Sequence, residues 1–491
     1  MTSYLGIDVG TSAVRVAHLR DDGSLLGVGS ESYASLRTGT DVVEQDPTAW
    51  TDALTTALRA LPDVDRDPPS SIGLCGQTPT LVLVDEHGRP MRNALTWQDT
   101  RATREARYLA ERFGDPTEIV GTALSWSAAN MPAKLLWLSR HEPDVTSHAR
   151  VALQPKDYIG LALTGSTLSD PWSSKGLCDV TRGVALADVL DACGWSSRVC
   201  PPTAAPWETR GTVSADAGER FGLRAGTPVT VGASDAIAEM IAAGSFARAS
   251  AFFFSGTSSI VGSTVADESV RVPGLFRVPT TCAPLPLLYG PTNSGGGAAL
   301  QWAARLLGVD VEDLLTLAAS AGRHWPTFVP YLSGERAPWW DLDVRALFLG
   351  VDERHGRAEM AKSVVVGVLL AARHVLSLVE GATRVPLGDV EVVSRGVQNP
   401  HWEAMALQSL GADLRFHHDP DMSARGAAML AMSLGGASVT EASRRLGAPS
   451  RVAHPERADV ETARHLLEDY RRASEQSLHW RHRDEVATPL R

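Results

Sequence analysis

The chain has 491 residues, which is too long for one ordinary hydrophobic core and predicts two domains of similar size. Its formal net charge of −11 argues against a nucleic-acid or anionic-membrane partner, and polar residues interrupt every apolar segment short of a membrane span. These apolar segments, and an N-terminus without a basic region before a hydrophobic one, predict a cytoplasmic protein. Five widely spaced cysteines without a Cys-x-x-Cys pair suggest neither a disulfide framework nor a zinc site, so we expect buried free thiols.

A glycine-containing turn stands between two apolar runs at the start of the chain. The apolar run before Asp8 and the period-2 pattern after Ser12 suit adjacent strands, and Gly10 permits a sharp reversal between them. Free N–H groups in such a turn form an anion-binding concavity, Thr11 adds a hydroxyl, and a carboxylate beside them suits Mg²⁺. An ordinary hairpin turn has the same pattern, and four residues do not separate the two interpretations.

Strands and helices then alternate, which is typical of an α/β domain. Asp46 followed by Pro47 predicts the start of a helix that ends near residue 60. Ligands of α/β domains gather in loops beyond strand ends, so the loops at Gln77 and Asp99 are candidate substrate walls. A turn or capping role is the alternative for both. Strands are expected at residues 71–76, 81–85 and 94–97.

An acidic residue follows the next clear strand. Residues 226–234 predict a strand that ends in small side chains, and residues 236–244 fit a helix that closes at Gly244. Asp235 would stand at the strand-to-helix junction, which suits a general base. Aspartate is also a common helix cap, so a structural role is the alternative.

The second half of the sequence repeats the design of the first. An apolar strand leads into Gly256-Thr257-Ser258, and a second apolar strand follows. Two such loops predict a duplicated fold that grips one polyphosphate between its halves. The glycine run 295–297 then opens a helix, and it either lets a nucleotide approach the backbone or serves as a hinge.

The remaining segments carry less chemistry. The charged loop at residues 328–338 is expected to be fixed by internal pairing, and the apolar helix at 359–380 should belong to the core. Residues 456–476 predict a charged surface helix. His417 and His418 have metal-ligand spacing, but the lack of a third ligand favours a solvated surface.

With these segments in order, the chain resembles the FGGY family of carbohydrate kinases, and its xylulokinase branch most closely. The resemblance covers residues 4 to about 436, and the ordered set of motifs is specific although each motif is weak alone. The motifs are Gly6-Ile7-Asp8-Val9-Gly10-Thr11, Gly73-Leu74-Cys75-Gly76-Gln77, Trp97-Gln98-Asp99-Thr100-Arg101, Pro155-Lys156-Asp157-Tyr158, Gly232-Ala233-Ser234-Asp235, Ser255-Gly256-Thr257-Ser258 and Pro330-Tyr331-Leu332-Ser333-Gly334-Glu335-Arg336.

The resemblance implies two ribonuclease-H-like domains of the actin and Hsp70 ATPase type, flanking a deep catalytic cleft. Residues 1–245 would bind the sugar, and residues 246–491 would bind ATP. The implied reaction moves the γ-phosphate of ATP to a hydroxyl of a ketopentose, D-xylulose first, or of a related sugar or polyol. ATP and Mg²⁺ are the implied cofactors, and a homodimer is expected by analogy.

The resemblance also implies residue roles. Asp235 would be the catalytic base, Asp8 and Asp235 would contact Mg²⁺, and Thr11 and Thr257 would face the transferred phosphate. The implied sugar-binding residues are Gln77, Thr78, Asp99, Asp235 and Ala236. The implied ATP and phosphate residues are Gly10, Thr11, Ser12, Gly256, Thr257, Ser258, Gly296, Gly297, Gly396 and Asn399.

The chain departs from the family where sugar hydroxyls are contacted. Thr78-Pro79-Thr80 replaces the usual Met-His-Gly, and Ala236 replaces the asparagine that usually follows the base. Losing hydrogen-bonding groups changes discrimination between sugars more than it changes the chemistry. A catalytically silent sugar or nucleotide sensor is one alternative, although a sensor needs neither Asp8 nor Asp235. A phosphatase or chaperone-like ATPase of the same superfamily is another.

Overall fold

The computed structural model describes residues 2–62, 67–247, 250–293, 295–394, 398–419 and 421–479. The chain forms two compact units. The first comprises Met1–Arg248, Arg277–Pro286 and Asp419–Ala448, and the second comprises Ala249–Phe276, Leu287–His418 and Pro449–Arg491. Two segments from later in the sequence, residues 277–286 and 419–448, therefore pack with the first unit. A single domain boundary near residue 245 does not describe this division. The assignment of the sugar to residues 1–245 and of ATP to residues 246–491 stays a prediction.

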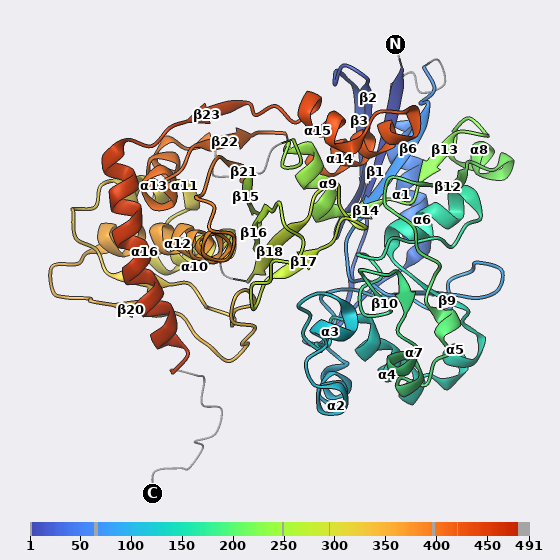
Figure 1. Ribbon diagram of the computed structural model, residues 1–491, viewed down its shortest axis with the longest axis horizontal. Helices are drawn as coiled ribbons and strands as arrows, with labels where there is room; N and C mark the ends of the chain where they lie inside the picture. Colours follow the sequence, from blue (N-terminus) through green and yellow to red (C-terminus); the bar gives the residue numbers. More distant parts are fainter. Residues whose placement is uncertain are drawn as a thin grey trace, which may run out of the picture. The chain divides into compact units, whose positions relative to one another are not determined.

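Figure 1 labels the strands and helices, which are numbered in the order in which they occur along the chain. The strands are β1 Ser3–Val9, β2 Ala13–Arg20, β3 Leu25–Ser32, β4 Leu36–Thr38, β5 Val42–Gln45, β6 Ser71–Gly76, β7 Val82–Val84, β8 Ala94–Leu95, β9 Val151–Leu153, β10 Cys178–Asp179, β11 Val184–Ala185, β12 Thr209–Thr212, β13 Pro228–Thr230, β14 Ala233–Ser234, β15 Ala251–Ser255, β16 Ser259–Thr264, β17 Phe276–Val278, β18 Leu287–Thr292, β19 Thr327–Val329, β20 Leu347–Leu349, β21 Val390–Ser394, β22 Leu414–His417 and β23 Arg451–Ala453. The α-helices are α1 Pro47–Arg59, α2 Thr103–Phe113, α3 Thr117–Val120, α4 Met131–His141, α5 Pro143–His148, α6 Pro155–Thr164, α7 Ala187–Ala192, α8 Ala215–Phe221, α9 Asp235–Ala242, α10 Gly297–Leu307, α11 Val311–Ala319, α12 Arg357–Thr383, α13 Pro400–Leu410, α14 Met422–Ala431, α15 Val439–Leu446 and α16 Arg457–Ser477.

The first unit is built on a mixed sheet. Its strand order is β12-β13-β6-β1-β2-β3, and β14 also pairs with β6. The predicted first hairpin is confirmed, because β1, β2 and β3 form an antiparallel meander. β6 runs parallel to β1, to β13 and to β14, so the carboxyl ends of these strands meet at one edge of the sheet.

The second unit repeats this topology. Its sheet contains the order β18-β16-β15-β21-β22-β23. β15, β16 and β18 form an antiparallel meander, β21 runs parallel to β15 and to β22, and β23 is an antiparallel edge strand. Each position matches a strand of the first sheet in direction. The duplication predicted from the two Gly-Thr-Ser loops is therefore confirmed in the strand order.

Helix α14 explains why residues 419–448 belong to the first unit. The helix lies so close to β1 and β6 that only glycines fit beneath it. A Cβ on Gly73 would lie 1.8 Å from the Ala427 carbonyl oxygen, and one on Gly6 would lie 1.9 Å from the Ala424 oxygen. The Ser71 hydroxyl donates to the Ala431 carbonyl at 2.7 Å. This backbone-to-backbone packing ties a late segment to the first strands of the chain.

Helix α12 is the predicted core helix. It is the one described helix that is long and apolar enough to cross a membrane, but 78% of its apolar window is buried. Sixteen of its 27 residues are buried, and nine of these belong to the apolar core of the second unit, which α11 and α13 also line. Burial on nearly all sides accounts for its composition.

One expectation for the second unit is confirmed and one is wrong. Helix α16 is the predicted charged surface helix, and it buries one face at Leu467, Tyr470 and Ala473. His417 is not solvated: it is 5% exposed on β22, and its Nε2 lies 2.7 Å from Glu391 Oε2. A buried acid on the neighbouring strand thus replaces the solvent that was expected around the histidine.

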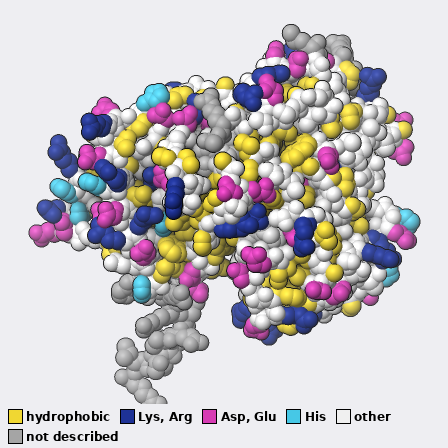
Figure 2. All heavy atoms as spheres, viewed as in Figure 1, with side chains coloured by type: hydrophobic (Ala, Val, Ile, Leu, Met, Phe, Trp, Pro, Cys, Tyr) yellow, Lys and Arg dark blue, Asp and Glu magenta, His cyan; other side chains and the backbone are white. Residues whose placement is uncertain are grey.

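On the face shown in Figure 2, acidic and basic side chains lie interspersed rather than in one basic stripe. Four of the five cysteines are buried, and Cys200 is partly exposed. All five are free thiols, as expected.

Candidate active site

The carboxyl edge of the first sheet brings the predicted acids together. Asp8 near the end of β1 is in register with Cys75 on β6, and Cys75 is in register with Ala233 on β14. The chain leaves these strands at Val9, Gly76 and Ser234. Asp8 at the end of β1, Gln77 after β6 and Asp235 after β14 therefore lie at the same edge of the sheet, where open α/β sheets bind ligands.

Asp8 is a buried acid with weak partners. Its side chain is 3% exposed, the Cys75 thiol donates to Oδ1 at 3.5 Å, and Arg15 Nη1 lies 3.7 Å from Oδ2. Burial raises the pKa of Asp8 to about 6, while Arg15 lowers it and Asp421 raises it. Such a carboxylate is stabilised by a further positive charge.

Asp235 is the first residue of α9 and not its cap. The cap is Ser234, whose hydroxyl accepts a hydrogen bond from the Ile237 N–H at 3.4 Å. The capping alternative for Asp235 is therefore wrong. Within the described residues, its Oδ1 accepts one hydrogen bond, from the adjacent Ala236 N–H at 2.8 Å. Burial and then the charge of Asp8 raise the pKa of Asp235 to about 7, which suits a base near neutral pH.

Sequence reasoning missed two side chains beside these acids. Glu239 lies one helical turn beyond Asp235, and burial, Asp235 and Asp8 raise its pKa to about 8. Arg15 is the cross-strand partner of Asp8, and its Nε lies 3.8 Å from Asp421 Oδ1. The sequence did contain a signal for Arg15, because it is a charged residue within a strand whose other residues are mostly apolar.

The first hairpin loop contains unpaired backbone N–H groups. Within the described residues, the N–H groups of Thr11 and Ser12 have no acceptor. The other polar atoms are held: Tyr33 donates to the Gly10 carbonyl, Gln45 to the Thr11 carbonyl at 2.8 Å, and Trp97 Nε1 to the Thr11 hydroxyl at 3.1 Å. A fixed loop with free N–H groups is suited to a phosphate.

Gln77 belongs to the network that fixes this loop. It is 1% exposed, and its Nε2 donates to Gln45 Oε1 at 2.8 Å. Gln45 in turn holds the Thr11 carbonyl, so the amide chain connects the β6 loop with the hairpin loop. The structure thus gives Gln77 a positioning contact.

The other predicted sugar residues differ in exposure. Asp99 is fully buried, where it binds Arg101 and accepts from the Val43 N–H at 2.9 Å. Its carboxylate is occupied by the protein, which matches the structural alternative. Thr78 is partly exposed, and Ala236 is 8% exposed with a methyl in place of an amide.

The second hairpin loop rests on the start of α10. The Gly297 N–H donates to the Gly256 carbonyl at 2.8 Å, and the Ala298 N–H donates to the Thr257 carbonyl at 3.1 Å. A Cβ on Gly296 would lie 2.9 Å from the Gly256 and Thr257 carbonyl oxygens. The glycine run therefore lets the hairpin loop approach the helix closely. The sequence had suggested a nucleotide contact or a hinge for these glycines, but not this packing role.

A cavity of about 550 Å³ opens beside this loop in the second unit. Gly256, Thr257, Gly297 and Asn399 line it, so it gathers four of the predicted ATP residues. Its apolar lining is Leu300, Val311, Leu315 and Trp402, and its polar lining includes Gln301, Glu312, Ser394 and Gln398. Asn399 also caps α13 by accepting from the His401 and Trp402 N–H groups. Gly396 lies outside the described residues.

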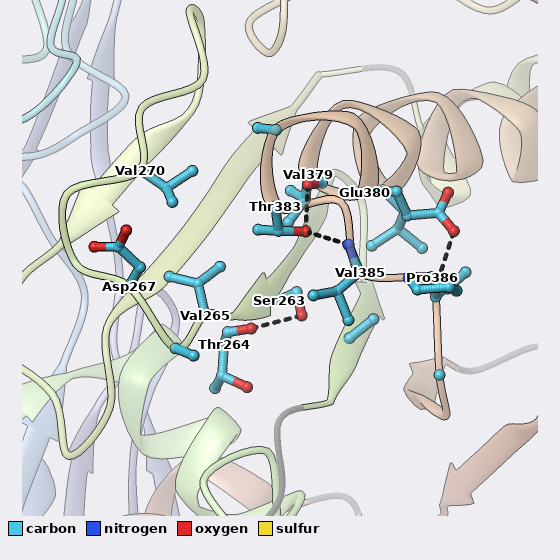
Figure 3. A pocket seen from close by; sticks show the side chains of 16 residues that line it. Ser263, Thr264, Val265, Asp267, Val270, Val379, Glu380, Thr383, Val385 and Pro386 are labelled. Atoms are coloured by element: carbon cyan, nitrogen blue, oxygen red, sulfur yellow. Dashed lines mark hydrogen bonds between the residues drawn. The ribbon is translucent and has the colours of Figure 1, made fainter.

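A smaller cavity of about 280 Å³ lies between the ends of β16 and α12 (Figure 3). Its polar groups bond to one another: the Thr383 hydroxyl donates to the Val379 carbonyl at 2.8 Å and accepts from the Val385 N–H at 3.3 Å. Glu380 accepts from the Leu387 N–H at 2.7 Å. None of the predicted site residues lines this cavity.

The donor set suits a magnesium ion that keeps waters and phosphate oxygens. No group of three His, Cys, Asp or Glu side chains in the described part of the chain is arranged to hold a metal by itself. Mg²⁺ usually takes one or two carboxylates and fills the remaining positions with water and substrate phosphates. Asp8 and Asp235, two carboxylates with raised pKa values, fit that requirement.

Comparison with known proteins agrees with this arrangement. Residues 3–242 match the N-terminal domain, and residues 251–434 the C-terminal domain, of the FGGY family of carbohydrate kinases. The chain belongs to this family. The FGGY fold, two α/β domains of the actin and Hsp70 ATPase type, is therefore the fold of this chain, as predicted. The family also makes it an ATP-dependent sugar kinase.

Xylulose kinases are among the proteins to which this chain is similar. A xylulose kinase of Escherichia coli K12 is 31% identical over 439 residues, which cover 87% of this chain and 89% of that protein. A xyloylose kinase structure from Brucella ovis has a TM-score of 0.87 and 26% identity, covering 97% of this chain and 99% of the other. A ligand-bound xylulose kinase from Lactobacillus acidophilus has a TM-score of 0.88 at 22% identity, with 97% and 98% covered.

Proposed function

We propose that this FGGY kinase phosphorylates a ketopentose, D-xylulose first, or a closely related sugar or polyol. The observation that carries the proposal is the convergence of Asp8, Asp235 and the free N–H groups of the hairpin loop at one sheet edge. The xylulose kinases among its relatives support the choice of the first acceptor. Pro79 and Ala236 stand where the family usually has a histidine and an asparagine, and the loss of these hydrogen-bonding groups leaves room for a related acceptor.

In the proposed mechanism, Asp235 accepts the proton of the sugar hydroxyl. The hydroxyl oxygen then forms a bond to the γ-phosphorus as the bond from that phosphorus to the β,γ-bridging oxygen breaks, and ADP leaves. The N–H groups of Thr11 and Ser12 and the Arg15 guanidinium face the phosphoryl oxygens. Gln77 and Asp99 keep the surrounding loops in position through their buried hydrogen bonds.

Asp8, together with Asp235, would hold Mg²⁺. When bound, the ion neutralises charge on the phosphates. In the second unit, the 550 Å³ cavity is the proposed nucleotide pocket, with the adenine against Trp402 and Leu315. Gly256, Thr257, Ser258, Gly296 and Gly297 are proposed on the phosphate side. A cytoplasmic location and a homodimer stay predictions.

The test is ADP release with a panel of pentuloses, hexuloses and polyols. We expect turnover with D-xylulose or a close relative, at a rate that depends on the sugar. ADP release without sugar dependence would instead favour the ATPase alternative, and no turnover with any member would contradict the proposal. Sugar binding without turnover would favour the sensor, which the family match does not support.

The Asp235→Asn variant tests the base. Removing the proton acceptor should lower kcat by about 10²- to 10⁴-fold, the range typical of general acid–base catalysis. The dissociation constant of a non-hydrolysable ATP analogue should change little, because the cavity for the nucleotide lies in the other unit. A variant that keeps full kcat would remove Asp235 from this role.

A further inference from the structure

Lysine is scarce in this protein, and its buried lysines have partners within the chain. The four lysines are at positions 134, 156, 175 and 362, and the first three are buried. Lys134 Nζ donates to three backbone carbonyl oxygens, and Lys156 Nζ lies 2.6 Å from an Asp157 carboxylate oxygen. Such partners compensate for the water that a buried charge loses.

The buried glutamates follow the same rule, and Glu239 does not. The three buried glutamates each have a partner: Glu105 lies 3.0 Å from Arg140 Nη1, Glu335 accepts from the Asn293 N–H at 2.6 Å, and Glu391 lies 2.7 Å from His417 Nε2. Glu239 is partly exposed, and within the described residues its carboxylate has neither a hydrogen bond nor an ion pair. The described chain therefore contains no structural role for this carboxylate.

Glu239 shares one face of α9 with the proposed base. The helix spans Asp235–Ala242, and its other six residues are all buried. Side chains four residues apart on an α-helix lie on the same face, with their Cβ atoms about 5–6 Å apart. Asp235 and Glu239 are thus neighbours, and they are the two side chains of α9 that a ligand can reach.

Other sides of α9 are held by helices α14 and α15. A Cβ on Gly426 of α14 would lie 1.8 Å from the Ala238 carbonyl oxygen, so the two helix backbones are in close contact. The Ser443 hydroxyl of α15 donates to the Ile241 carbonyl at 2.9 Å. These contacts fix the rotation of α9 about its axis, and in this orientation Asp235 and Glu239 remain accessible.

The carboxylate of Glu239 can reach the space beside the base. Long side chains on a helix lean toward its N-terminus, over the preceding turn. The preceding turn of α9 contains Asp235 and Ala236, and Ala236 contributes only a methyl group. The small side chain leaves room over that turn for a ligand group that contacts both acids.

A sugar hydroxyl is the group that fits this position. A hydroxyl donates a hydrogen bond to a carboxylate, and a sugar carries hydroxyls on neighbouring carbons, so one molecule can contact two carboxylates. A metal ion fits less well, because no three His, Cys, Asp or Glu side chains in the described ranges are arranged to hold one.

We propose that Glu239 binds a hydroxyl of the acceptor next to the hydroxyl that Asp235 deprotonates, and that Glu239 thereby selects acceptors with hydroxyls on both carbons. The hydrogen bond to Glu239 presents the neighbouring hydroxyl to the base. A site that hydrogen-bonds a hydroxyl discriminates strongly against the analogue that lacks it. This inference rests on the proposed sugar-kinase function.

The experiment compares kcat/KM of full-length wild type, Glu239→Ala and Glu239→Gln with the best acceptor of the panel and with its single-deoxy analogues. In wild type, loss of the hydroxyl next to the phosphorylated one should lower kcat/KM about 10- to 100-fold, the range for a hydrogen bond to a charged group. Glu239→Ala should lose a similar factor with the best acceptor. The same analogue should then cost little more, because both changes remove one interaction.

Glu239→Gln keeps an acceptor oxygen without the charge, so its kcat/KM should lie between those of wild type and Glu239→Ala. Thermal melts separate binding from a structural role. Glu239→Ala removes a carboxylate without a partner and adds a good helix former, so its thermal midpoint should not fall. A lower midpoint would show that Glu239 stabilises the fold and would overturn the proposal.

Glu219→Ala is the matched control. It replaces an exposed glutamate on α8, in the same unit, by the same residue. It should leave kcat/KM unchanged for the best acceptor and for each analogue. An equal loss in Glu219→Ala and Glu239→Ala would show that the effect is not specific to the site and would overturn the role of Glu239.

The remaining outcomes separate this inference from the proposed function. Full kcat/KM of Glu239→Ala with the best acceptor overturns the role of Glu239 and leaves the sugar kinase standing. So does an analogue penalty that is as large in Glu239→Ala as in wild type. A loss that excess Mg²⁺ restores also overturns the role, because Glu239 would then act on the metal. No turnover of any acceptor by wild type overturns both.

Discussion

At the scale of single residues, the site contains three acidic side chains whose ionised form is unfavourable. The proposed reaction nevertheless needs Asp8 and Asp235 in their ionised form. Asp8, Asp235 and Glu239 all have raised pKa values, mainly because of burial. When the pKa of a group is higher in the folded protein than in the unfolded chain, the folded protein still holds a proton at pH values between the two, where the unfolded chain has released it. Its contribution to stability is therefore lost as pH rises through the folded value. The site should be most destabilising at alkaline pH.

Glu239→Gln tests this sign. The pKa of Glu239 is about 8 in the folded protein and near 4.5 in an unfolded chain. Wild-type stability should therefore fall relative to the variant as pH rises from about 5 to about 8, and the thermal midpoint of the variant should exceed that of wild type by about 2–4 °C for each kcal/mol gained. Thermal melts without nucleotide or Mg²⁺ at pH 5 and pH 8.5 measure the difference.

The control is Glu111→Gln, which replaces an exposed glutamate on α2 and should show no such pH trend. A constant offset between wild type and Glu239→Gln at both pH values would mean that packing, and not ionisation, accounts for the effect.

A site residue could be predicted from the sequence when a local pattern of neighbouring residues marks it. It could not be predicted when its place in the site depends on tertiary structure. Asp8, Thr11 and Asp235 stand at strand ends beside small residues, a local pattern that the sequence shows directly. Arg15 and Glu239 enter the site through pairing register and helix geometry, which appear only when strands and helices are placed. The three carbonyl groups that accept hydrogen bonds from Lys134 belong to residues far away in sequence.

At the scale of elements, the second hairpin and α10 act as one piece. The carbonyls of Gly256 and Thr257 accept the first free N–H groups of the helix, so the start of α10 is capped by the loop proposed to hold the phosphate. The proposed phosphate contacts thus depend on how closely this loop approaches the helix. The backbone of Gly296 is extended, with φ of −131°, so an alanine would be limited by space and not by backbone conformation.

Gly296→Ala should therefore displace the loop. Its Cβ would lie 2.9 Å from two carbonyl oxygens, closer than carbon and oxygen tolerate, and the hairpin tip would have to move. We expect KM for ATP to rise by about tenfold or more, because small displacements of positioning groups are costly in catalysis. Steady-state kinetics with varied ATP measure the change.

Gly381→Ala is the comparison, since an added Cβ at Gly381 in α12 meets nothing within 4 Å. It should leave KM for ATP unchanged and raise stability slightly, because alanine favours the helix. Equal effects of the two variants on KM would show that the contact between the hairpin loop and α10 is not responsible.

At the scale of the whole molecule, the chain returns to its first unit after building most of the second. The strand order of both sheets could be predicted as a duplication, because each hairpin carries the same local signal. The return of residues 419–448 could not, because α14 is held by backbone contacts to Gly6 and Gly73 that leave no periodic mark in the helix itself. Apolar patterning indicates which face of a helix is buried but not against which sheet.

A fragment of residues 1–245 should therefore fail to fold cooperatively. It lacks α14, so the face of β1 and β6 that this helix covers would be exposed. Near-ultraviolet circular dichroism and thermal melting of the fragment, beside the full chain, measure this. A sharp transition and native-like aromatic signals in the fragment would show that the segment is dispensable.

The scarcity of lysine has a practical consequence for labelling chemistry. Amine-reactive dyes and cross-linkers need an accessible, unprotonated amine, and three of the four lysines are buried. Lys362, partly exposed on α12, is the remaining side-chain target. Among lysine side chains, an N-hydroxysuccinimide ester should accordingly modify Lys362 in the second unit and spare the three buried lysines of the first.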